Sequence, residues 1–339
     1  MKFGPVPLDQ ALGAISAHSV RLGDHVIKKG ARLTSDDLSA LRFEGRDHVI
    51  VAQLEADDIN EDQAAQTLAA KLCGAAIRMD RPSTGRVNLF AQSAGVLRVD
   101  AARINALNAI DESVTFATLP DYRAVERGEM VATVKIIPFA VQKSVMDKTD
   151  VVIGAIPLVT VYPFKSRKVA AISTLLPGLK PSVINKTLAV LEGRLAPSGS
   201  SVDSDLRVSH DIDAVKEALT SSLDDGADLV IIYGASAITD RRDIIPSAIE
   251  KAGGHIEHFG MPVDPGNLLL IGSLRGKTVI GAPGCARSPK ENGFDWVLHR
   301  LMADLPVTRA DVTSLGVGGL LMEIVQRGHP RDPSGEPVE

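Results

Sequence analysis

The stretch DLVIIYGASAITDRRD, residues 228–243, contains residue types that bind phosphate and a divalent cation. Its apolar run is typical of a buried strand. Small, hydroxyl and acidic residues follow that run: Gly234, Ser236, Thr239, Asp240 and Asp243. The free N–H groups at a helix start favour anions, and small residues let a phosphate approach them. Two aspartates beside a phosphate suggest Mg²⁺, which typically binds one or two carboxylates together with phosphate oxygens.

An ordinary strand-to-helix turn uses the same residue types. In that arrangement Asp240 caps the following helix and Asp243 pairs with Arg241 or Arg242. Spacing alone leaves both interpretations open, so the choice depends on two further loops.

The second loop, STLLPGLKPSVIN at residues 173–185, follows another apolar run. Ser173, Thr174 and Asn185 are candidates for hydrogen bonds to a ligand, because Asn185 falls in the first turn of the predicted helix. The alternative is a capped helix preceded by a solvated Lys180.

The third region combines GMPVDPGNLLLIG with GKTVIGAPGCARSPKENG and contains two Pro-Gly pairs. Its candidate ligand-binding residues are Pro265, Gly266, Pro283, Gly284, Arg287 and Ser288. Arg287 suits a phosphate contact because guanidinium geometry matches phosphate oxygens. Turn formation alone is the alternative explanation for both Pro-Gly pairs. Cys285 is a poor candidate nucleophile, because the histidines around it fit no catalytic signature.

These loops must be positioned by the strands before them. From about residue 151, short apolar strands alternate with amphipathic helices, as in a mostly parallel sheet covered on both faces. The predicted strands are 168–173, 203–208, 228–233, 255–259, 267–272 and 277–281, and the predicted helices are 182–194, 211–224, 243–252 and 289–303. Ligands bind beyond the carboxyl ends of such strands, so we expect the three loops at one edge.

Residues 1–150 predict an α+β region with antiparallel strands, and it divides into at most two small subdomains. We expect helices over 8–16, 34–45 and 60–72, strands over 25–30 and 48–54, and strand-like alternation from 81 to about 141. RPSTGRVNLF is interpreted as a hairpin turn. The predicted domains are 1–150, 151–325 and a disordered tail or linker at 326–339.

The bulk composition excludes several classes of function. A net charge of −5 disfavours broad binding to nucleic acid or to anionic membranes. Two distant cysteines make a disulfide framework or a zinc site improbable, and the absence of GxGxxG after the first strand disfavours dinucleotide binding. No export signal or apolar membrane span is present, so we expect a cytoplasmic protein.

Taken together, the three loops resemble the molybdopterin-binding domain of molybdopterin adenylyltransferases and molybdenumtransferases. IST with Asn185, GASAITDRRD and the two Pro-Gly loops stand where that family has its ligand loops. RDIIPSAI looks like the adenylyltransferase form, which places Asp243 opposite that family's functional aspartate, and Asp240 matches the molybdenumtransferase form. The resemblance implies a three-layer α/β domain that binds molybdopterin, with Asp240 and Asp243 as Mg²⁺ ligands and catalytic residues, and with ATP as a further substrate.

The resemblance extends over nearly the whole chain to the N-terminal half of bacterial two-part proteins. In those proteins a molybdopterin-binding region precedes a nucleotidyltransferase similar to a cytidylyltransferase. Segments such as TGRVNLFAQSAGVLRVD and GAPGCARSPKENGFDWVLHRL carry this likeness. It implies a nucleotidyltransferase or an apo-molybdoenzyme as a partner, and a homo-oligomer by analogy.

Three functions remain open from the sequence. The first is adenylyl transfer or molybdate insertion. The second is a non-catalytic carrier that presents the pterin, which is favoured by Ala235 and Ala237 where relatives have glycine, and by Cys285 where they have asparagine. The third is hydrolysis of a nucleotide derivative.

Overall fold

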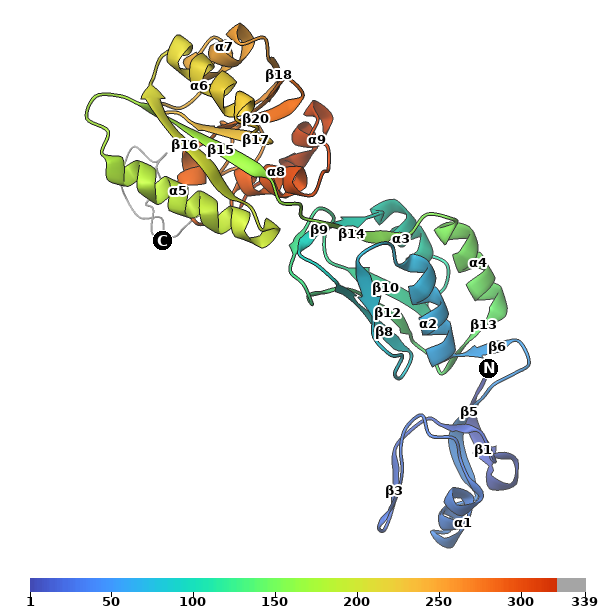
Figure 1. Ribbon diagram of the computed structural model, residues 1–339. Coiled ribbons are helices and arrows are strands. Elements are labelled where there is room, and N and C mark those ends of the chain that lie inside the picture. The colour runs from blue at the N-terminus through green and yellow to red at the C-terminus, as the bar shows by residue number, and fades with distance from the viewer. Residues whose placement is uncertain (322–339) are drawn as a thin grey trace, which may run out of the picture. The chain divides into compact units, whose positions relative to one another are not determined.

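The computed structural model describes residues 1–321, and it divides after Pro163 into two units (Figure 1). Each unit has its own hydrophobic cores. The second unit, which begins at Phe164, contains all of the sequence-predicted site residues.

A six-stranded sheet in the order β16-β15-β17-β20-β19-β18 forms the centre of the second unit. Its strands are β15 (Lys168–Leu175), β16 (Ser201–Ser209), β17 (Leu229–Tyr233), β18 (His255–Phe259), β19 (Leu270–Leu274) and β20 (Lys277–Ala282). β15 pairs in parallel with β16 and β17, and β17 pairs in parallel with β20. Only β19 runs antiparallel to its neighbours. The predicted three-layer α/β fold with a mostly parallel sheet is confirmed.

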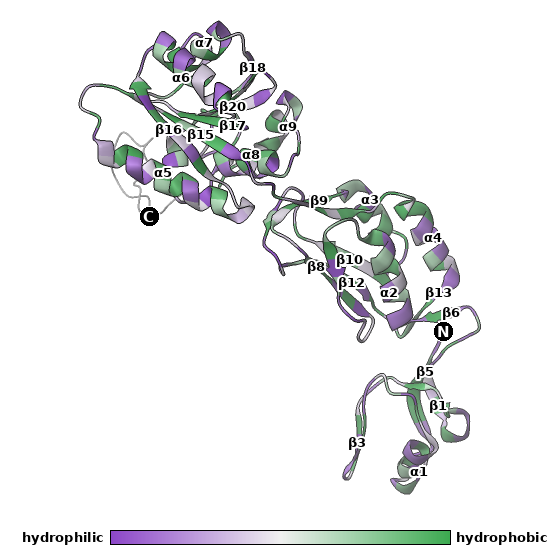
Figure 2. Cartoon of the chain, viewed as in Figure 1, coloured by the Kyte–Doolittle hydropathy of each residue, from purple (hydrophilic) through white to green (hydrophobic). Residues whose placement is uncertain are grey.

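Helices cover both faces of this sheet (Figure 1). They are α5 (Pro181–Leu195), α6 (Ile212–Asp224), α7 (Ile244–Lys251), α8 (Gly293–Met302) and the short α9 (Arg309–Thr313), with 3-10 turns η2 (Ala196–Ser198), η3 (Gly284–Arg287) and η4 (Ser314–Gly316). Leu191 of α5 and Phe294 of α8 share one core, and Leu219 of α6 and Ile249 of α7 share the other. Figure 2 shows hydrophilic and hydrophobic residues on different sides of α5 and α6, as expected of helices with one buried face.

The strand order reverses at β15, and we call the region outside the carboxyl ends of β15, β17 and β20 the crevice, because sheets with such a reversal bind ligands there. From β15 the chain crosses to β16 on one side, and the next strand, β17, lies on the other side of β15. Ligands bind where the strand order reverses in this way, outside the carboxyl ends. The loops after β15, β17 and β20 all leave the sheet at this edge, because the three strands are parallel.

Two elements of this unit begin later in the structure than the sequence predicted. The helix predicted over 289–303 begins at Gly293, because Asn292 forms a capping box with Asp295 and residues 289–292 stay in the loop. The strand predicted over 267–272 is Leu270–Leu274, because Leu269 N–H donates to Gly266 O in a turn before it.

The first unit is built from antiparallel ladders, as predicted. Its N-terminal part contains β1 (Lys2–Pro7), η1 (Leu8–Gln10), β2 (Ile15–Ser16), β3 (Val20–Leu22), β4 (His25–Ile27), α1 (Ser35–Phe43) and β5 (His48–Gln53). The rest contains β6 (Asp58–Asn60), α2 (Glu61–Leu72), β7 (Ile77–Met79), β8 (Arg86–Ala91), β9 (Gly95–Val99), α3 (Ala101–Asn108), β10 (Val114–Thr118), β11 (Ala124–Val125), β12 (Met130–Ile136), β13 (Ala140–Gln142), α4 (Lys143–Ile153) and β14 (Val159–Pro163). The predicted hairpin at RPSTGRVNLF connects β7 and β8.

The prediction of a helix over residues 8–16 was wrong. Only Leu8–Gln10 form a 3-10 turn, Gly13 adopts a left-handed φ of 75°, and Ile15–Ser16 pair with β5 as β2. Helices α3 and α4 were not predicted either. α3 lies in the segment interpreted as strands, and Asp100 caps it by accepting a hydrogen bond from Arg103 N–H.

The predicted domain boundaries at residues 150 and 325 stay predictions. The tail predicted at 326–339 lies outside the described residues. Within residues 1–321, no helix is both long enough and apolar enough to cross a membrane.

Two alanine substitutions test the packing of the second unit. At Gly254 an added Cβ would lie 2.7 Å from Ser273 O and 2.9 Å from Ile249 O, both backbone atoms. We therefore expect Gly254→Ala to lower the free energy of unfolding by about 1–3 kcal/mol. Gly193→Ala is the matched control, because Gly193 lies in α5 and an added Cβ there meets nothing within 4 Å.

Gly193→Ala should raise the free energy of unfolding by about 0.5–1 kcal/mol, since alanine loses less backbone entropy in a helix. Calorimetric unfolding of both variants measures the difference. Equal stabilities would contradict the packing around Gly254.

Candidate functional site

Thr174 connects three strand ends at the crevice. It is buried at the end of β15, and its Oγ1 accepts a hydrogen bond of 2.7 Å from Ala235 N–H, after β17. The same oxygen lies 2.9 Å from His210 Nδ1, after β16. Thr174 thus has a structural role, and Ala235 N–H is already used.

Ser173 and Tyr233 present buried hydroxyl groups on the opposite face of the sheet. They are register neighbours on β15 and β17, and each residue is 1% exposed. Tyr233 packs in the core that α5 and α8 cover, and alternation along β15 places Ser173 on that same face. Neither hydroxyl has a hydrogen-bond partner within residues 1–321. Burial raises the pKa of Tyr233, so its hydroxyl keeps its proton.

Arg287 joins the loops after β17 and β20 to helix α5. Its Nη2 donates to Gly234 O at 2.9 Å, and its Nη1 donates to Thr187 Oγ1 at 3.0 Å. The guanidinium carbon lies 5.4 Å from the centre of the Tyr233 ring, in cation–π contact. The structure therefore brings Arg287, Gly234 and the end of β17 together.

A buried ion pair fixes the segment that carries Arg287. Arg194, in the last turn of α5, pairs with Asp295 of α8, and the two side chains are 8% and 9% exposed. Arg194 also donates to Ala286 O and Ser288 O, both at 2.7 Å. Because these carbonyls flank Arg287, the ion pair sets the position of its guanidinium.

In an ordinary strand-to-helix turn, Asp240 was expected to cap the helix and Asp243 to form an ion pair. The structure shows the two roles exchanged. Asp243 caps α7, with Oδ1 accepting from Ile244 N–H at 2.8 Å and Oδ2 from Thr239 N–H at 3.2 Å. Asp240 pairs with Arg242, and hydrogen bonds from Arg242 lower the pKa of Asp240 to about 2. Both carboxylates keep free lone pairs for a cation. Within the described chain, no group of three or more His, Cys, Asp or Glu residues could hold a metal.

Gly234 and Ser236 shape the start of this loop. A Cβ at Gly234 would lie 2.5 Å from Ser236 O, so only glycine fits here without a backbone shift. Ser236 is exposed, and its Oγ donates to Ala237 O at 3.3 Å. These residues remain accessible to a ligand.

Three predicted residues have partners that hold the structure together. Asn185 Oδ1 accepts a hydrogen bond of 2.8 Å from Arg207, on the β16 side of α5. Pro265 follows a cis peptide bond and accepts from Gly293 N–H at 2.8 Å. A Cβ at Gly266 would lie 2.9 Å from Gly293 Cα, so this Pro-Gly pair packs on the start of α8.

The second Pro-Gly pair lies nearer to Arg287. Pro283 precedes the 3-10 turn η3, and Gly284 is exposed at its first position, where an added Cβ would meet nothing within 4 Å. Ser288 Oγ accepts from Lys290 N–H at 3.3 Å. Burial raises the pKa of Cys285, which agrees with its rejection as a nucleophile.

Sequence reasoning missed four residues of this region: Thr187, Arg194, Tyr233 and Asp295. Their contacts join α5, β17 and α8, which are distant in sequence. Of these four residues, Thr187 alone could have been found from the sequence, because it lies two positions after the predicted Asn185 on the same helix.

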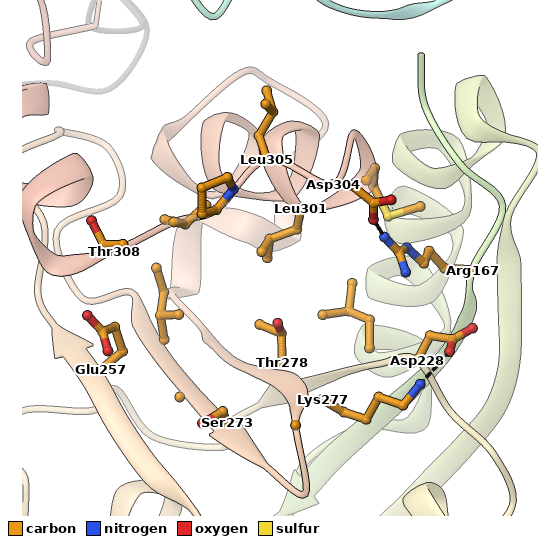
Figure 3. Close-up of a pocket in the computed structure, with 17 residues that line it drawn as sticks. Arg167, Asp228, Glu257, Ser273, Lys277, Thr278, Leu301, Asp304, Leu305 and Thr308 are labelled. Atoms are coloured by element: carbon orange, nitrogen blue, oxygen red, sulfur yellow. Dashed lines mark hydrogen bonds and ion pairs between the residues drawn. The ribbon is translucent and has the colours of Figure 1, made fainter. Parts of the chain in front are cut away.

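A separate cavity of about 610 Å³ lies at the opposite edge of the sheet, where β17 and β20 begin (Figure 3). None of the sequence-predicted residues line it. Arg167 pairs there with Asp304, and Lys277 pairs with Asp228 at 2.8 Å. Because these charges are already paired, the crevice at the carboxyl edge is the better candidate site.

The chain is similar to known families in two segments. Residues 170–303 match the family model described as a probable molybdopterin binding domain. Residues 5–53 match a domain of unknown function. A search of curated proteins found no match.

Remote likenesses to solved structures accompany the family matches. A molybdopterin biosynthesis moea protein from Pyrococcus horikosii is 15% identical, with 89% of this chain and 75% of that chain covered and a TM-score of 0.33. Molybdenum cofactor biosynthesis protein B is 16% identical, with 42% and 96% covered and a TM-score of 0.30. A molybdopterin biosynthesis protein from Mycobacterium abscessus is 15% identical, with 42% and 92% covered and a TM-score of 0.28. The function proposed for this chain does not depend on these likenesses.

Removing the Arg194 side chain tests the ion pair. Arg194→Met leaves Asp295 buried without its cation, so we expect the free energy of unfolding to fall by about 3–5 kcal/mol. The control is Arg275→Met, which breaks an exposed pair with Asp224 and should cost no more than about 1 kcal/mol. Denaturant unfolding measures both, and similar losses would show that burial of the Arg194 pair is unimportant.

Proposed function

Because residues 170–303 match the model of the probable molybdopterin binding domain, we propose that this protein binds molybdopterin, or its nucleotide form, in molybdenum cofactor biosynthesis. The ligand occupies the crevice at the carboxyl ends of β15, β17 and β20. The observation that carries the proposal is the meeting of Arg287 with Gly234 and Thr187, because it joins two of the predicted ligand loops.

The loop after β17 supplies hydrogen bonds to the ligand. Ser236 and Thr239 are exposed there, and Asp243 caps the start of α7. Ser173 and Thr174 lie buried at the end of β15, beneath the ligand loops, Asn185 and Ser288 lie at the rim of the crevice, and the Pro265-Gly266 and Pro283-Gly284 loops wall the pterin. These roles follow the positions of the residues along one sheet edge.

Asp240 and Asp243 are the residues that would hold Mg²⁺. Both lie in one turn, where Asp243 N–H donates to Asp240 O at 3.1 Å. Mg²⁺ would compete with Arg242 for Asp240. Bound there with ATP, the ion would neutralise phosphate charge during adenylyl transfer to molybdopterin or its reversal during molybdate insertion.

A carrier is the second candidate function. Asp243 is already used as the helix cap and Asp240 as an ion-pair partner, and Ala235 N–H is bonded to Thr174. A protein of this kind would hold the pterin and present it to a nucleotidyltransferase partner or to an apo-molybdoenzyme. Assembly as a homo-oligomer fits either function.

An adenylation assay separates the enzyme from the carrier. Purified protein is incubated with molybdopterin and Mg·ATP, and the adenylated product is measured. Asp243→Asn keeps a good helix cap but removes the charge, so we expect it to fold, to bind pterin and to lose at least about 100-fold in turnover.

Tight pterin binding without product in the unsubstituted protein would support the carrier. Absence of pterin binding would overturn both functions. Asp213→Asn is a matched control, because Asp213 is an exposed carboxylate on α6, outside the crevice.

Gly284→Ala tests whether the ligand passes close to the second Pro-Gly loop. The substitution should leave the unfolding temperature within about 1 °C, because the added Cβ contacts nothing in the free protein. We expect molybdopterin affinity to fall about 10-fold through contact with the bound ligand. Unchanged affinity, measured by calorimetric titration, would place the ligand away from Gly284.

A further inference from the structure

Arg287 has no carboxylate partner among residues 1–321, which distinguishes it from three other partly buried arginines. Arg98, Arg103 and Arg194 each pair with an aspartate. Arg287 instead donates to two neutral oxygens and stacks on a ring. Burial lowers the pKa of the Arg287 guanidinium, and among the described residues no acid offsets that effect. Since arginine stays protonated in proteins, this positive charge is left without a counter-charge.

The guanidinium also keeps unused donors. Of about five N–H groups, the hydrogen bonds to Gly234 and Thr187 use two. Gly284 lies three residues earlier in the same turn, and an added Cβ there would meet nothing within 4 Å. Arg287 therefore keeps donors for an anion, and the turn that carries it leaves space at Gly284.

Two buried hydroxyls lie on the same face of the sheet as Arg287. Ser173 Oγ and Tyr233 Oη have no partner within residues 1–321, and the Tyr233 ring is in direct contact with the guanidinium. A buried hydroxyl without a hydrogen bond costs about 1–3 kcal/mol, so such groups usually meet water or a ligand. A neutral hydroxyl donates readily to an anion, and the Tyr233 ring, which contacts Arg287 and is the register neighbour of Ser173, brings such donors to this side of the sheet.

We propose that Arg287 binds the phosphate monoester of the ligand directly, with Ser173 and Tyr233 behind it, and that this contact needs no metal ion. The inference rests on the proposed function, because it assigns the phosphate of the same ligand. It also separates two tasks in the crevice. Arg287 holds the terminal phosphate, whereas Asp240 and Asp243 remain available for a second, metal-bound group such as the phosphates of ATP.

Charge also favours Arg287 over the loop after β17 as the phosphate contact. That loop holds two aspartates and two arginines, so its formal charge is zero, and the Arg242 side chain is 91% exposed and already bound to Asp240. A phosphate placed there would meet no net positive charge. At Arg287 it meets a positive charge in a partly dehydrated position, where charge-assisted hydrogen bonds are strong.

An NMR titration with inorganic phosphate tests the proposal on the full chain. The Nε–H signal of Arg287, assigned from its loss in Arg287→Lys, is followed as phosphate is added in the presence of EDTA. We expect a saturable shift of this signal. No shift up to saturating phosphate would overturn the proposal without any variant being needed.

Substitutions of Arg287 test whether this residue binds the phosphate. Arg287→Gln should raise the phosphate dissociation constant about 10-fold or more, because one charge-assisted contact is lost. The phosphate dissociation constant of Arg287→Lys should lie between those of the unsubstituted protein and Arg287→Gln, because lysine keeps the charge but loses the planar geometry. Arg242→Gln is the control and should bind phosphate as the unsubstituted protein does. Equal affinity in Arg287→Gln would indicate an adventitious ion only and would overturn the proposal.

Repeating the phosphate titration with MgCl₂ in place of EDTA distinguishes binding at Arg287 from binding at the two aspartates. If phosphate binds only with MgCl₂ present, and Asp243→Asn abolishes it, the aspartates hold the phosphate and the proposal fails. Binding that is equal with EDTA and with MgCl₂ supports it. Folding of each variant is checked by its unfolding temperature.

Competition shows whether this inference or the proposed function fails. Molybdopterin and AMP are each titrated into the phosphate complex. Displacement by molybdopterin supports both ideas. Displacement by AMP alone supports a phosphate monoester site at Arg287 and overturns the pterin function. Binding of molybdopterin without any movement of the Arg287 signal overturns this inference and leaves the proposed function standing.

Discussion

The buried pair between Arg194 and Asp295 is the interaction on which the candidate site depends. It joins the last turn of α5 to the first turn of α8, and Arg194 also binds the carbonyls of the segment between them. Asp295 has a second task, because its Oδ2 accepts from Asn292 N–H in the capping box that starts α8. Two charges out of water are stable only with such full hydrogen bonding. The loop that carries Arg287 is consequently held from both helices at once.

This arrangement places a rigid wall opposite a more exposed one. The segment around Arg287 is fixed by side chains of α5 and α8. In residues 236–242 after β17, Ile238 packs in the core, and the side chains of Ser236 and Asp240 bond to near neighbours. A ligand between the two segments would meet preformed donors on one side and exposed polar side chains on the other. Such a division suits a site that binds a small molecule and also admits a second substrate or a partner.

The sheet and the position of the site could be predicted from the sequence because both depend on local patterns. Apolar runs such as LVIIY mark buried parallel strands, and the loops that follow must share an edge once the strands are parallel. Arg287 was predicted from its place after a Pro-Gly pair. Its neighbours Thr187 and Tyr233 were not, because their contacts depend on how α5 and β17 pack, which no local pattern specifies. The short α3 was missed for a related reason: only Ile104 and Leu107 of that helix are buried, too few to give a helical period.

Thr174 has a consequence for the direction of hydrogen bonding at the crevice. Its oxygen accepts a hydrogen bond from Ala235 N–H and still keeps a second lone pair and its proton for His210 Nδ1. The hydroxyl can therefore donate to a bare Nδ1 or accept from a protonated one, so it pairs with either neutral tautomer of the ring. One side chain thus ties the backbone after β17 to the imidazole after β16 and leaves the ring free to change its proton position.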